Sequence, residues 1–374
     1  MKDVSPLTTR FSKCILTHPD SIFYFFNCST PGNSFVCVVC VDGTFTCIVR
    51  DLEVGHYKQC RLDMKFVTYA ENNPIDLLVY ALGTYPHDEC TVGIEIDSPR
   101  FLLSEAKQLF ECLPFVKFVD ISMTIKSIRI IKKEDEIDKM TIACTHVISA
   151  LQHSKSKLYL GMTETEYAGI LAFEKMKSGS EWTTYPDFVA FGMNGCIGHH
   201  TASPQKCLQP NEIIFVEVSA TCDRYHASKM HTFYTGEPPF WFKCLESRIH
   251  EAMTHARHIA KAGVQCRDVD AAMRAIINAP FDNTTETMPT FCMMRRSGYT
   301  IGIGTCVDWT EGIVRLTPTS KDILQENMVL HLIPWIHVEG KGAMGFSDMV
   351  VVKPEGLQSL FDEQHTFVTS WPIA

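Results

Sequence analysis

Residues 213–236 read IIFVEVSATCDRYHASKMHTFYTG, and this stretch decides the fold. Apolar, β-branched and aromatic residues fill both of its ends, which predicts strands over residues 213–219 and 232–235. Glu217 interrupts the first apolar run. A carboxylate in a central strand is costly unless it is paired or takes part in function. Glu217 is therefore a candidate functional residue, although a lone buried glutamate is commonly explained by a structural salt bridge.

Two other segments also place polar residues beside apolar strands. Residues 198–204 (GHHTASP) form a loop with two histidines, and residues 297–312 (SGYTIGIGTCVDWTEG) are dense in glycine, aromatic residues and carboxylates. A later strand over residues 328–333 carries His331. Each feature has a structural explanation too, because histidines near strand ends are often structural and glycines serve turns. None of these segments identifies a function by itself.

A charged junction, KSIRIIKKED at residues 126–135, divides the chain. Before it, two β-rich runs flank Asp42-Gly43, a strong hairpin signal. After it, helical patterns alternate with strands. We therefore expect an α/β domain over residues 1–125 and an α+β catalytic domain over residues 126–374.

Helix signals are clear in the second predicted domain. Thr163 and Glu166 have the spacing of a capping box that opens a helix. Further helices are expected over residues 241–262, ended by Gly263, and over residues 269–277. An earlier helix follows the junction, and its apolar stripe consists of Ile137, Met140, Cys144, Val147 and Leu151.

Composition excludes several classes of partner. The 374 residues carry a formal net charge of −9 and no run of Lys and Arg, so nothing attracts a phosphate backbone or an anionic membrane. The longest apolar stretches are far shorter than a bilayer span, and the first thirty residues lack the pattern of a secretory signal. We expect a soluble, cytoplasmic protein with no nucleic-acid or membrane partner.

The order and spacing of these segments resemble the pita-bread family, which includes creatinase, prolidase and aminopeptidase P. The resemblance is close over residues 126–374, beginning with RIIKKEDEIDKM at residues 129–140, and looser before, where GIEIDSPRFLL stands at residues 93–103. It implies a C-terminal pita-bread domain behind a smaller creatinase-type N-terminal α/β domain. It also implies a homodimer.

The metallopeptidases of this family bind two metal ions through two Asp, one His and two Glu. The resemblance places these positions on Glu217, Ser228, Tyr299, Ile333 and Ser347, with Asp348 beside the last. Hard divalent ions need several carboxylate oxygens around them. We therefore expect no metal site and no cofactor.

Two metal-free members, creatinase and ectoine hydrolase, also lack this ligand set, and the sequence looks more similar to the ectoine hydrolase branch. The creatinase substrate clamp, a Phe-x-Arg, matches residues 28–32 (CSTPG), which hold no Arg. The catalytic histidine of creatinase matches His200. The segments that look like ectoine hydrolase are Glu217, residues 224–226 (RYH), 298–302 (GYTIG), 308–312 (DWTEG) and 331–334 (HLIP).

The resemblance implies a hydrolase that cleaves a C–N bond of a small cationic amidine or guanidine compound. A protonated amidine carbon is already electrophilic, so the reaction needs a base for water and an acid for the leaving nitrogen. We expect His200 to be this base and Glu217 to stabilise the cation or to attack as a nucleophile. The residues expected to bind substrate are His226, Tyr299, Asp308, Trp309, Glu311, His331 and Asp348.

Two alternatives stay open: an Xaa-Pro dipeptidase or aminopeptidase, and a catalytically silent pita-bread protein used for binding. Two departures from the family pattern bear on them. His231 stands where the family carries an Arg, and Asp348 stands where ectoine hydrolase carries a longer Glu. Either change indicates an altered substrate or a loss of activity.

Overall fold

The computed structural model describes residues 4, 9–29, 32, 34–60, 64–71, 73–84, 87, 89–281, 287–305, 308–361 and 370–371. The chain forms two compact units. The first comprises Met1–Arg129 and Ile303–Asp308, and the second comprises Ile130–Gly302 and Trp309–Ala374. The expected boundary between residues 125 and 126 lies inside helix α6 (Ser122–Arg129), whereas the division lies at the end of that helix.

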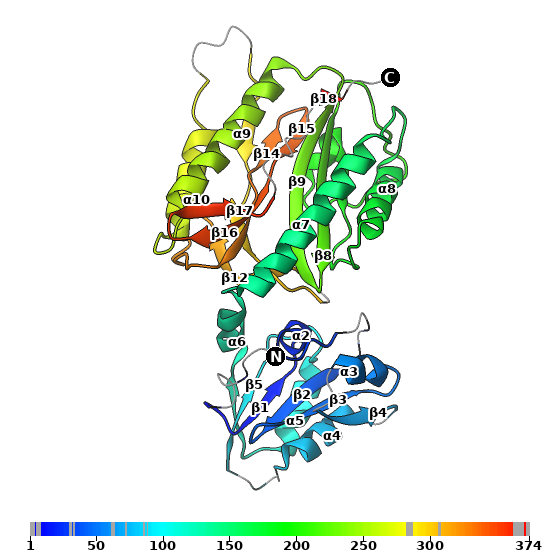
Figure 1. Cartoon of the computed structure of the whole chain (residues 1–374), viewed down its shortest axis with the longest axis vertical. Coiled ribbons are helices and arrows are strands. Elements are labelled where there is room, and N and C mark those ends of the chain that lie inside the picture. The colour runs from blue at the N-terminus through cyan, green and yellow to red at the C-terminus, as the bar shows by residue number, and fades with distance from the viewer. Residues whose placement is uncertain are drawn as a thin grey trace. The chain divides into compact units, whose positions relative to one another are not determined.

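The first unit is built on a six-stranded mixed sheet with the strand order β4-β3-β2-β1-β5-β6 (Figure 1). Asp42 and Gly43 both have positive φ, 47° and 78°, and join β2 to β3 in the predicted hairpin. The strands are β1 (Lys13–Leu16), β2 (Val36–Val41), β3 (Thr44–Arg50), β4 (Lys65–Tyr69), β5 (Thr91–Ile94) and β6 (Lys117–Asp120). The helices are α2 (Pro19–Phe26), α3 (Val54–Cys60), α4 (Pro74–Leu82), α5 (Leu103–Cys112) and α6.

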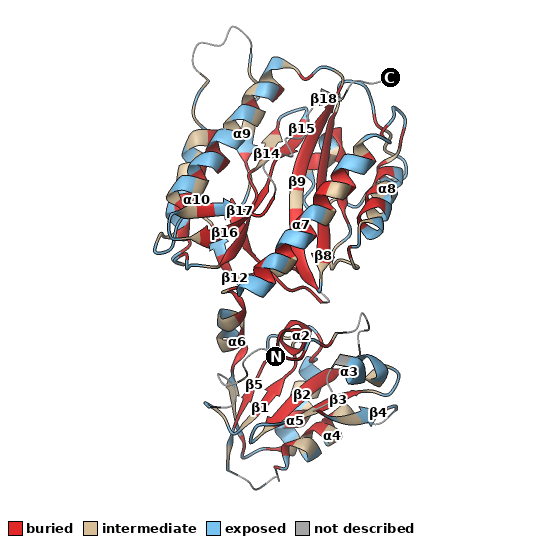
Figure 2. Cartoon of the chain, in the orientation of Figure 1, coloured by how far each residue is buried: buried red, intermediate tan, exposed pale blue. Residues whose placement is uncertain are grey.

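The α-helices in the described part of the second unit are α7 (Glu134–Lys155), α8 (Glu164–Lys177), α9 (Phe240–Ile259) and α10 (Cys266–Ile277). The predicted stripe of α7 is buried, and α7 packs across β8 and β9 (Figure 2). The predicted capping box of α8 is present, with the N–H of Glu166 donating to Thr163 Oγ1 at 3.2 Å. Among the described residues, no helix is long and apolar enough to cross a membrane.

The described strands of the second unit form three sheets, with the orders β18-β9-β8-β7, β12-β11-β13-β16-β17 and β10-β14-β15. With the helices this makes the α+β architecture that the sequence predicts. The strands of the first of these sheets are β7 (Phe188–Phe191), β8 (Ile213–Cys222), β9 (Tyr225–Thr235) and β18 (Ser370–Trp371). Those of the other two are β10 (Phe291–Met293), β11 (Gly298–Ile301), β12 (Thr310–Leu316), β13 (Val329–Leu332), β14 (Trp335–Val338), β15 (Gly342–Gly345), β16 (Asp348–Lys353) and β17 (Gly356–Ser359).

The hairpin of residues 213–236 is longer than predicted. β8 and β9 pair in one uninterrupted antiparallel register from Ile213 opposite Tyr234 to Cys222 opposite Tyr225. The polar residues at its turn end still pair as strand, because they are buried and their backbone groups need partners inside the ladder. Figure 2 shows both strands buried along their length.

Candidate active site

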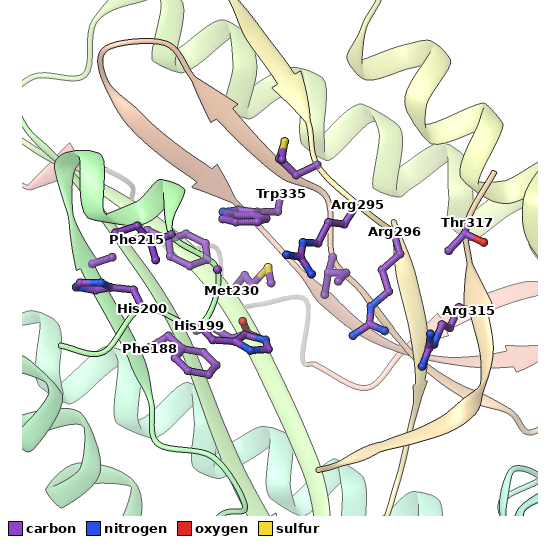
Figure 3. Close-up of a pocket in the computed structure, with 16 residues that line it drawn as sticks. Phe188, His199, His200, Phe215, Met230, Arg295, Arg296, Arg315, Thr317 and Trp335 are labelled. Carbon is purple, nitrogen blue, oxygen red and sulfur yellow. The ribbon is translucent and has the colours of Figure 1, made fainter. Parts of the chain in front are cut away.

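The second unit contains a cavity of about 440 Å³, a size that suits a small molecule. One wall is the sheet of β7, β8 and β9, and another is the loop that contains residues 197–200. The remaining wall comes from residues 294–296, from the end of β12, and from the connection between β13 and β14 (Figure 3). Segments far apart in the sequence therefore enclose one space.

The strand wall follows from alternation along the strands. Side chains two residues apart share a face, so Phe215 and Glu217 of β8 both line the cavity. Across the ladder, Phe188 and Met230 lie opposite Glu217 and line the cavity too. Glu217 is 8% exposed, and Ser228 Oγ donates to its Oε1 at 3.3 Å. The predicted Glu217 is thus a nearly buried carboxylate at the cavity wall.

His200, the predicted base, also lines the cavity and is held from behind by a second glutamate. Its Nε2 lies 2.7 Å from Oε2 of Glu164, which is completely buried. Glu164 accepts three further hydrogen bonds, from the N–H groups of Phe191 and Ser203 at 2.7 and 2.8 Å and from Asn194 Nδ2 at 2.9 Å. Glu164 therefore holds residues 191–203, here called the histidine loop, at both ends and at two points between them.

His199 is the ring that stands open to the cavity, and the sequence analysis passed over it in favour of its neighbour. It is exposed, and its imidazole stacks on Phe188 with the ring centroids 5.2 Å apart. Its φ of 56° lies in the left-handed region, which is unusual for a residue with a side chain. Such strain is found at functional sites more often than elsewhere. Figure 3 shows His199 and Phe188 on one side of the cavity.

Three arginines line the opposite side, and the sequence analysis missed all of them. Arg295 and Arg296 lie between β10 and β11, and Arg315 lies on β12 directly opposite Tyr299 of β11. The guanidinium carbon of Arg296 lies 4.3 Å from the centre of the Tyr299 ring. Figure 3 shows the three side chains following one another along this side of the cavity. The cavity therefore holds more positive than negative charge.

Two of the positions that the resemblance matched to metal ligands, Tyr299 and Ser347, belong to a hydrogen-bonded chain of neutral groups. Trp309 Nε1 donates to the hydroxyl of Tyr299 at 3.0 Å, and that hydroxyl lies 3.0 Å from His331 Nδ1. His331 Nε2 lies 2.8 Å from Ser347 Oγ. Burial, together with the positive charges of Lys229 and Arg296, lowers the pKa of His331 to about 3, so the ring is neutral near pH 7.

This donor set does not fit a two-metal centre. Three of the five positions hold Ser228, Tyr299 and Ser347, whose hydroxyls are protonated near neutral pH and carry no charge for a hard divalent ion. Among the residues that the structure describes, no group of three or more His, Cys, Asp and Glu is arranged to hold a metal ion. Tyr299, Trp309 and His331 are brought together, but as a buried hydrogen-bonded chain behind the cavity wall.

Two predicted carboxylates do not reach the cavity, because basic residues remote in the sequence bind them. Glu311 Oε2 lies 2.5 Å from Lys132 Nζ, with both side chains almost completely buried. A Cβ on Gly302 would come within 2.6 Å of Glu311 Oε1, so only glycine leaves room for this pair. Asp348 lies 3.2 Å from Arg257 Nη1 and accepts from Ser359 Oγ at 2.7 Å.

Of the other residues considered in the sequence analysis, His226 and Asp308 do not line the cavity, and part of the segment 28–32 lies outside the described residues. The ring of His226 is buried, with Nδ1 3.1 Å from the carbonyl of Arg224 and Nε2 accepting from the N–H of Thr184 at 3.3 Å. Asp308 belongs to the first unit. The segment matched to the creatinase clamp, residues 28–32, includes Thr30 and Pro31, which lie outside the described residues.

Comparison with known proteins agrees with this architecture. Residues 138–354 match the metallopeptidase family M24, and residues 10–131 match the creatinase/prolidase N-terminal domain. An ectoine hydrolase from Halomonas elongata is 26% identical over 329 residues, which cover 82% of this chain and 79% of that protein. An uncharacterized peptidase from Staphylococcus aureus (strain USA300) is 25% identical over 349 residues, which cover 92% of this chain and 93% of that protein.

Solved structures give the same assignment. The X-Pro aminopeptidase from Thermotoga maritima MSB8 superimposes with a TM-score of 0.80 and 25% identity, covering 100% of both chains. The prolidase from Pyrococcus horikoshii OT3 superimposes with a TM-score of 0.81 over 96% of both chains, and its 19% identity makes this a likeness of fold alone. The chain therefore belongs to metallopeptidase family M24, a family of hydrolases, with a creatinase-type N-terminal domain and a pita-bread C-terminal domain.

Proposed function

We propose that this protein is a hydrolase that cleaves a C–N bond in a small substrate with a negatively charged group, and that it needs no metal ion. The composition of the cavity carries this proposal. A nearly buried glutamate and two histidines supply groups that move protons, and three arginines supply groups that bind a carboxylate. The hydroxyl groups of Ser228, Tyr299 and Ser347, at the positions matched to metal ligands, favour a route that does not polarise the substrate through a metal.

The charge of the cavity changes the substrate that the sequence analysis expected. A purely cationic amidine would meet one glutamate and three guanidinium groups, so its binding would be opposed by repulsion. A zwitterion is complementary in charge to both sides of the cavity, because its cationic amidine can pair with Glu217 and its carboxylate with the arginines. Ectoine, which appears in the name of the Halomonas relative, is a cyclic amidine with a carboxylate and has this charge pattern.

For the proton transfers we favour His199, with His200 as the second candidate. The ring of His199 is open to the cavity, whereas Nε2 of His200 is already bound by Glu164 at 2.7 Å. The base takes a proton from water while the water oxygen adds to the carbon of the C–N bond. The same ring then returns the proton to the leaving nitrogen, and the C–N bond breaks. The products are a carbonyl compound and an amine.

Glu217 has two possible roles in this reaction. It pairs with the positive charge at the amidine, or its oxygen attacks the carbon. In the second case the C–N bond breaks, the nitrogen leaves with a proton from the histidine, and water then hydrolyses the bond between Glu217 and the carbon. Intact-protein mass spectrometry during turnover separates the two roles. A covalent adduct that forms on the wild type and is absent from a Glu217→Gln variant supports attack, and its absence at short times supports charge pairing.

A peptidase that acts on a dipeptide is the second candidate function. It is favoured by the full-length likeness to the X-Pro aminopeptidase. A dipeptide also offers a C–N bond and a carboxylate for the arginines. It lacks the built-in electrophile of a protonated amidine, however, and the donor set here does not provide the carboxylates that a two-metal peptidase centre needs.

Proton NMR of the purified chain with ectoine and with a set of Xaa-Pro dipeptides tests the proposal, each in chelator and with added Mn²⁺. We expect turnover in chelator, and a loss of roughly 10²–10⁴ in rate for His199→Ala if this ring is the general base. His200→Ala decides between the two histidines. His255→Gln, which changes an exposed histidine on α9, is the matched control. Turnover of dipeptides only with Mn²⁺ supports the peptidase, and no turnover of any compound supports a binding protein.

We also propose that the substrate is a small molecule and that the chain is a homodimer, as the resemblance implies. Light scattering behind size-exclusion chromatography tests the dimer. A mass near twice that of the 42.2 kDa chain is the expected result, and a mass near that of one chain contradicts it.

A further inference from the structure

The arginines of the cavity differ from the other arginines of the second unit. Those outside the cavity each lie within 4.0 Å of a carboxylate oxygen; they are Arg224, Arg248, Arg257, Arg267 and Arg274. Arg295 and Arg315 line the cavity, are exposed and form no ion pair with any described residue. Two guanidinium groups are thus left to bind a group that comes from outside the chain.

The segment that carries Arg295 and Arg296 is held rigidly from behind. Arg274 of α10 donates to the carbonyl oxygens of Met293 at 3.3 Å and of Arg295. Nε of Arg274 also lies 2.8 Å from Asp270 Oδ2, and the other oxygen of Asp270 accepts from Ser297 Oγ at 2.7 Å. Asp270 is completely buried.

The contacts of Arg274 hold Arg295 in an unusual backbone conformation. Arg295 has a φ of 47°, a conformation that costs energy for a residue with a side chain and persists because the contacts of Arg274 fix it. A loop backbone that is held in place before the ligand arrives loses less conformational entropy on binding. The backbone that carries Arg295 is therefore preorganised.

The cavity carries more positive charge than one carboxylate of a ligand would neutralise. Of the three guanidinium groups that line the cavity, those of Arg295 and Arg315 form no ion pair with a described residue, so two positive charges are available to a ligand. A single carboxylate is already satisfied by one bidentate arginine. Figure 3 shows Arg295 beside Trp335, Arg315 beside Thr317, and Arg296 between them, so Arg295 and Arg315 stand at separate places along the wall. Two separate anionic groups fit this spacing better than one compact anion such as phosphate.

We propose that the substrate of this site is a dicarboxylate: a derivative of an acidic amino acid whose two carboxylates bind Arg295 and Arg315. The inference rests on the proposed function for the location of the reacting C–N bond beside Glu217 and His199. Arg296, which lies over the ring of Tyr299, adds to the positive field between the two anchors. The apolar rings of Phe215 and Trp335 line the remaining space.

Equilibrium binding to the full chain tests the inference without any turnover. Isothermal titration at low ionic strength compares glutarate with pentanoate, which has the same length and one carboxylate, and with inorganic phosphate. We expect glutarate to bind about tenfold or more tightly than pentanoate, because the second carboxylate gains a charged hydrogen-bonding partner. Equal affinities, tighter binding of phosphate, or no binding of glutarate at millimolar concentrations would overturn the proposal.

Substitutions of the two arginines test whether they bind the two carboxylates of glutarate. Arg295→Gln and Arg315→Gln should each weaken glutarate about tenfold, to the affinity of pentanoate. Both side chains are exposed and form no ion pair within the described part of the chain, so the variants should keep the thermal midpoint of the wild type. Arg267→Gln removes an exposed arginine that pairs with Asp268 and should change nothing. An unchanged glutarate affinity in both cavity variants contradicts the assignment.

The outcomes separate this inference from the proposed function. Selective binding of glutarate without hydrolysis of any C–N compound supports the dicarboxylate site and rejects the hydrolase. Turnover of a monocarboxylate such as ectoine, without any preference for glutarate over pentanoate, supports the hydrolase and rejects the dicarboxylate.

Discussion

Replacing Glu164 by Gln should destabilise the second unit and disorder the histidine loop. The carboxylate accepts four hydrogen bonds, and glutamine keeps its shape but exchanges one oxygen for an NH₂ group. If the NH₂ replaces Oε2, the imidazole of His200 can change tautomer and accept from it, but the N–H of Ser203 loses its acceptor. If it replaces Oε1, the amide of Asn194 can rotate, but the N–H of Phe191 loses its acceptor.

Either orientation therefore leaves one buried backbone donor without a partner. Such a loss costs about 1–3 kcal/mol, so we expect the free energy of unfolding to fall by about 2 kcal/mol. The hydrolysis rate should fall as well, since the loop that carries His199 and His200 loses its fixed point. Urea unfolding followed by tryptophan fluorescence is a suitable assay, because all five tryptophans of the chain belong to the second unit.

Glu166→Gln is the matched control. Glu166 stands in the same first turn of α8 and also accepts from a backbone N–H, that of Thr163, but its side chain is exposed and water can replace the lost contact. We expect it to lose less stability than Glu164→Gln and to keep the activity. If the two variants unfold at the same urea concentration, Glu164 is not the support that its four contacts indicate.

Three further predictions concern buried groups of the second unit. His331 has a pKa of about 3 in the folded chain, below its ordinary value of about 6.5 in the unfolded chain. As the pH falls below about 6.5 the unfolded chain therefore binds a proton that the folded chain does not, and the free energy of unfolding decreases. Between pH 6 and 4 the free energy of unfolding should therefore fall less steeply in His331→Asn than in the wild type, by roughly 1.4 kcal/mol per pH unit, and equal slopes would contradict the shift. Lys132→Met leaves Glu311 buried without its cation and should cost about 3–5 kcal/mol by denaturant unfolding, most of which Lys132→Met/Glu311→Gln should recover. Tyr299→Phe removes the acceptor of an indole N–H and should cost about 1–3 kcal/mol in the same assay, whereas a loss near zero would mean that water takes its place.

Local patterns in the sequence were sufficient for most of the fold. The hairpin at Asp42-Gly43, the capping box at Thr163 and the apolar stripe of α7 depend on residues close together in the chain, and all three are confirmed. The hairpin of residues 213–236 was underestimated, since its polar centre does not look like strand. Burial of that centre against α7 decides its structure, and the local composition does not contain this information.

The candidate site was harder to predict, because its residues meet only in three dimensions. Glu217 was found because a charge inside an apolar run is visible in one strand. Glu164 looked like an ordinary surface position in the first turn of a helix, and only the packing of residues 191–203 around it reveals its role. Arg295 and Arg315 are separated in sequence, and nothing local indicates that they face one cavity.

The same argument explains the carboxylates that were assigned to the substrate. Glu311 and Asp348 stand in conspicuous motifs, but each is bound by a basic residue more than ninety positions away in the chain, Lys132 and Arg257. A signal was available for the arginines. The doublet at residues 295–296 directly precedes the glycine-rich segment that the sequence analysis had already selected, and positive charge beside a candidate site deserves the same weight as negative charge.

The most direct test of the account is the rate of C–N hydrolysis, measured with the best substrate of the NMR set, before and after removal of metal ions. The chain is dialysed against chelator, its metal content is measured by mass spectrometry, and the rate is determined with and without added Mn²⁺, Co²⁺ or Zn²⁺. The proposed mechanism, in which His199 and Glu217 carry the chemistry, predicts an unchanged rate in the metal-free chain and no increase on addition of metal. A rate that disappears with the metal and returns when it is added would contradict the account.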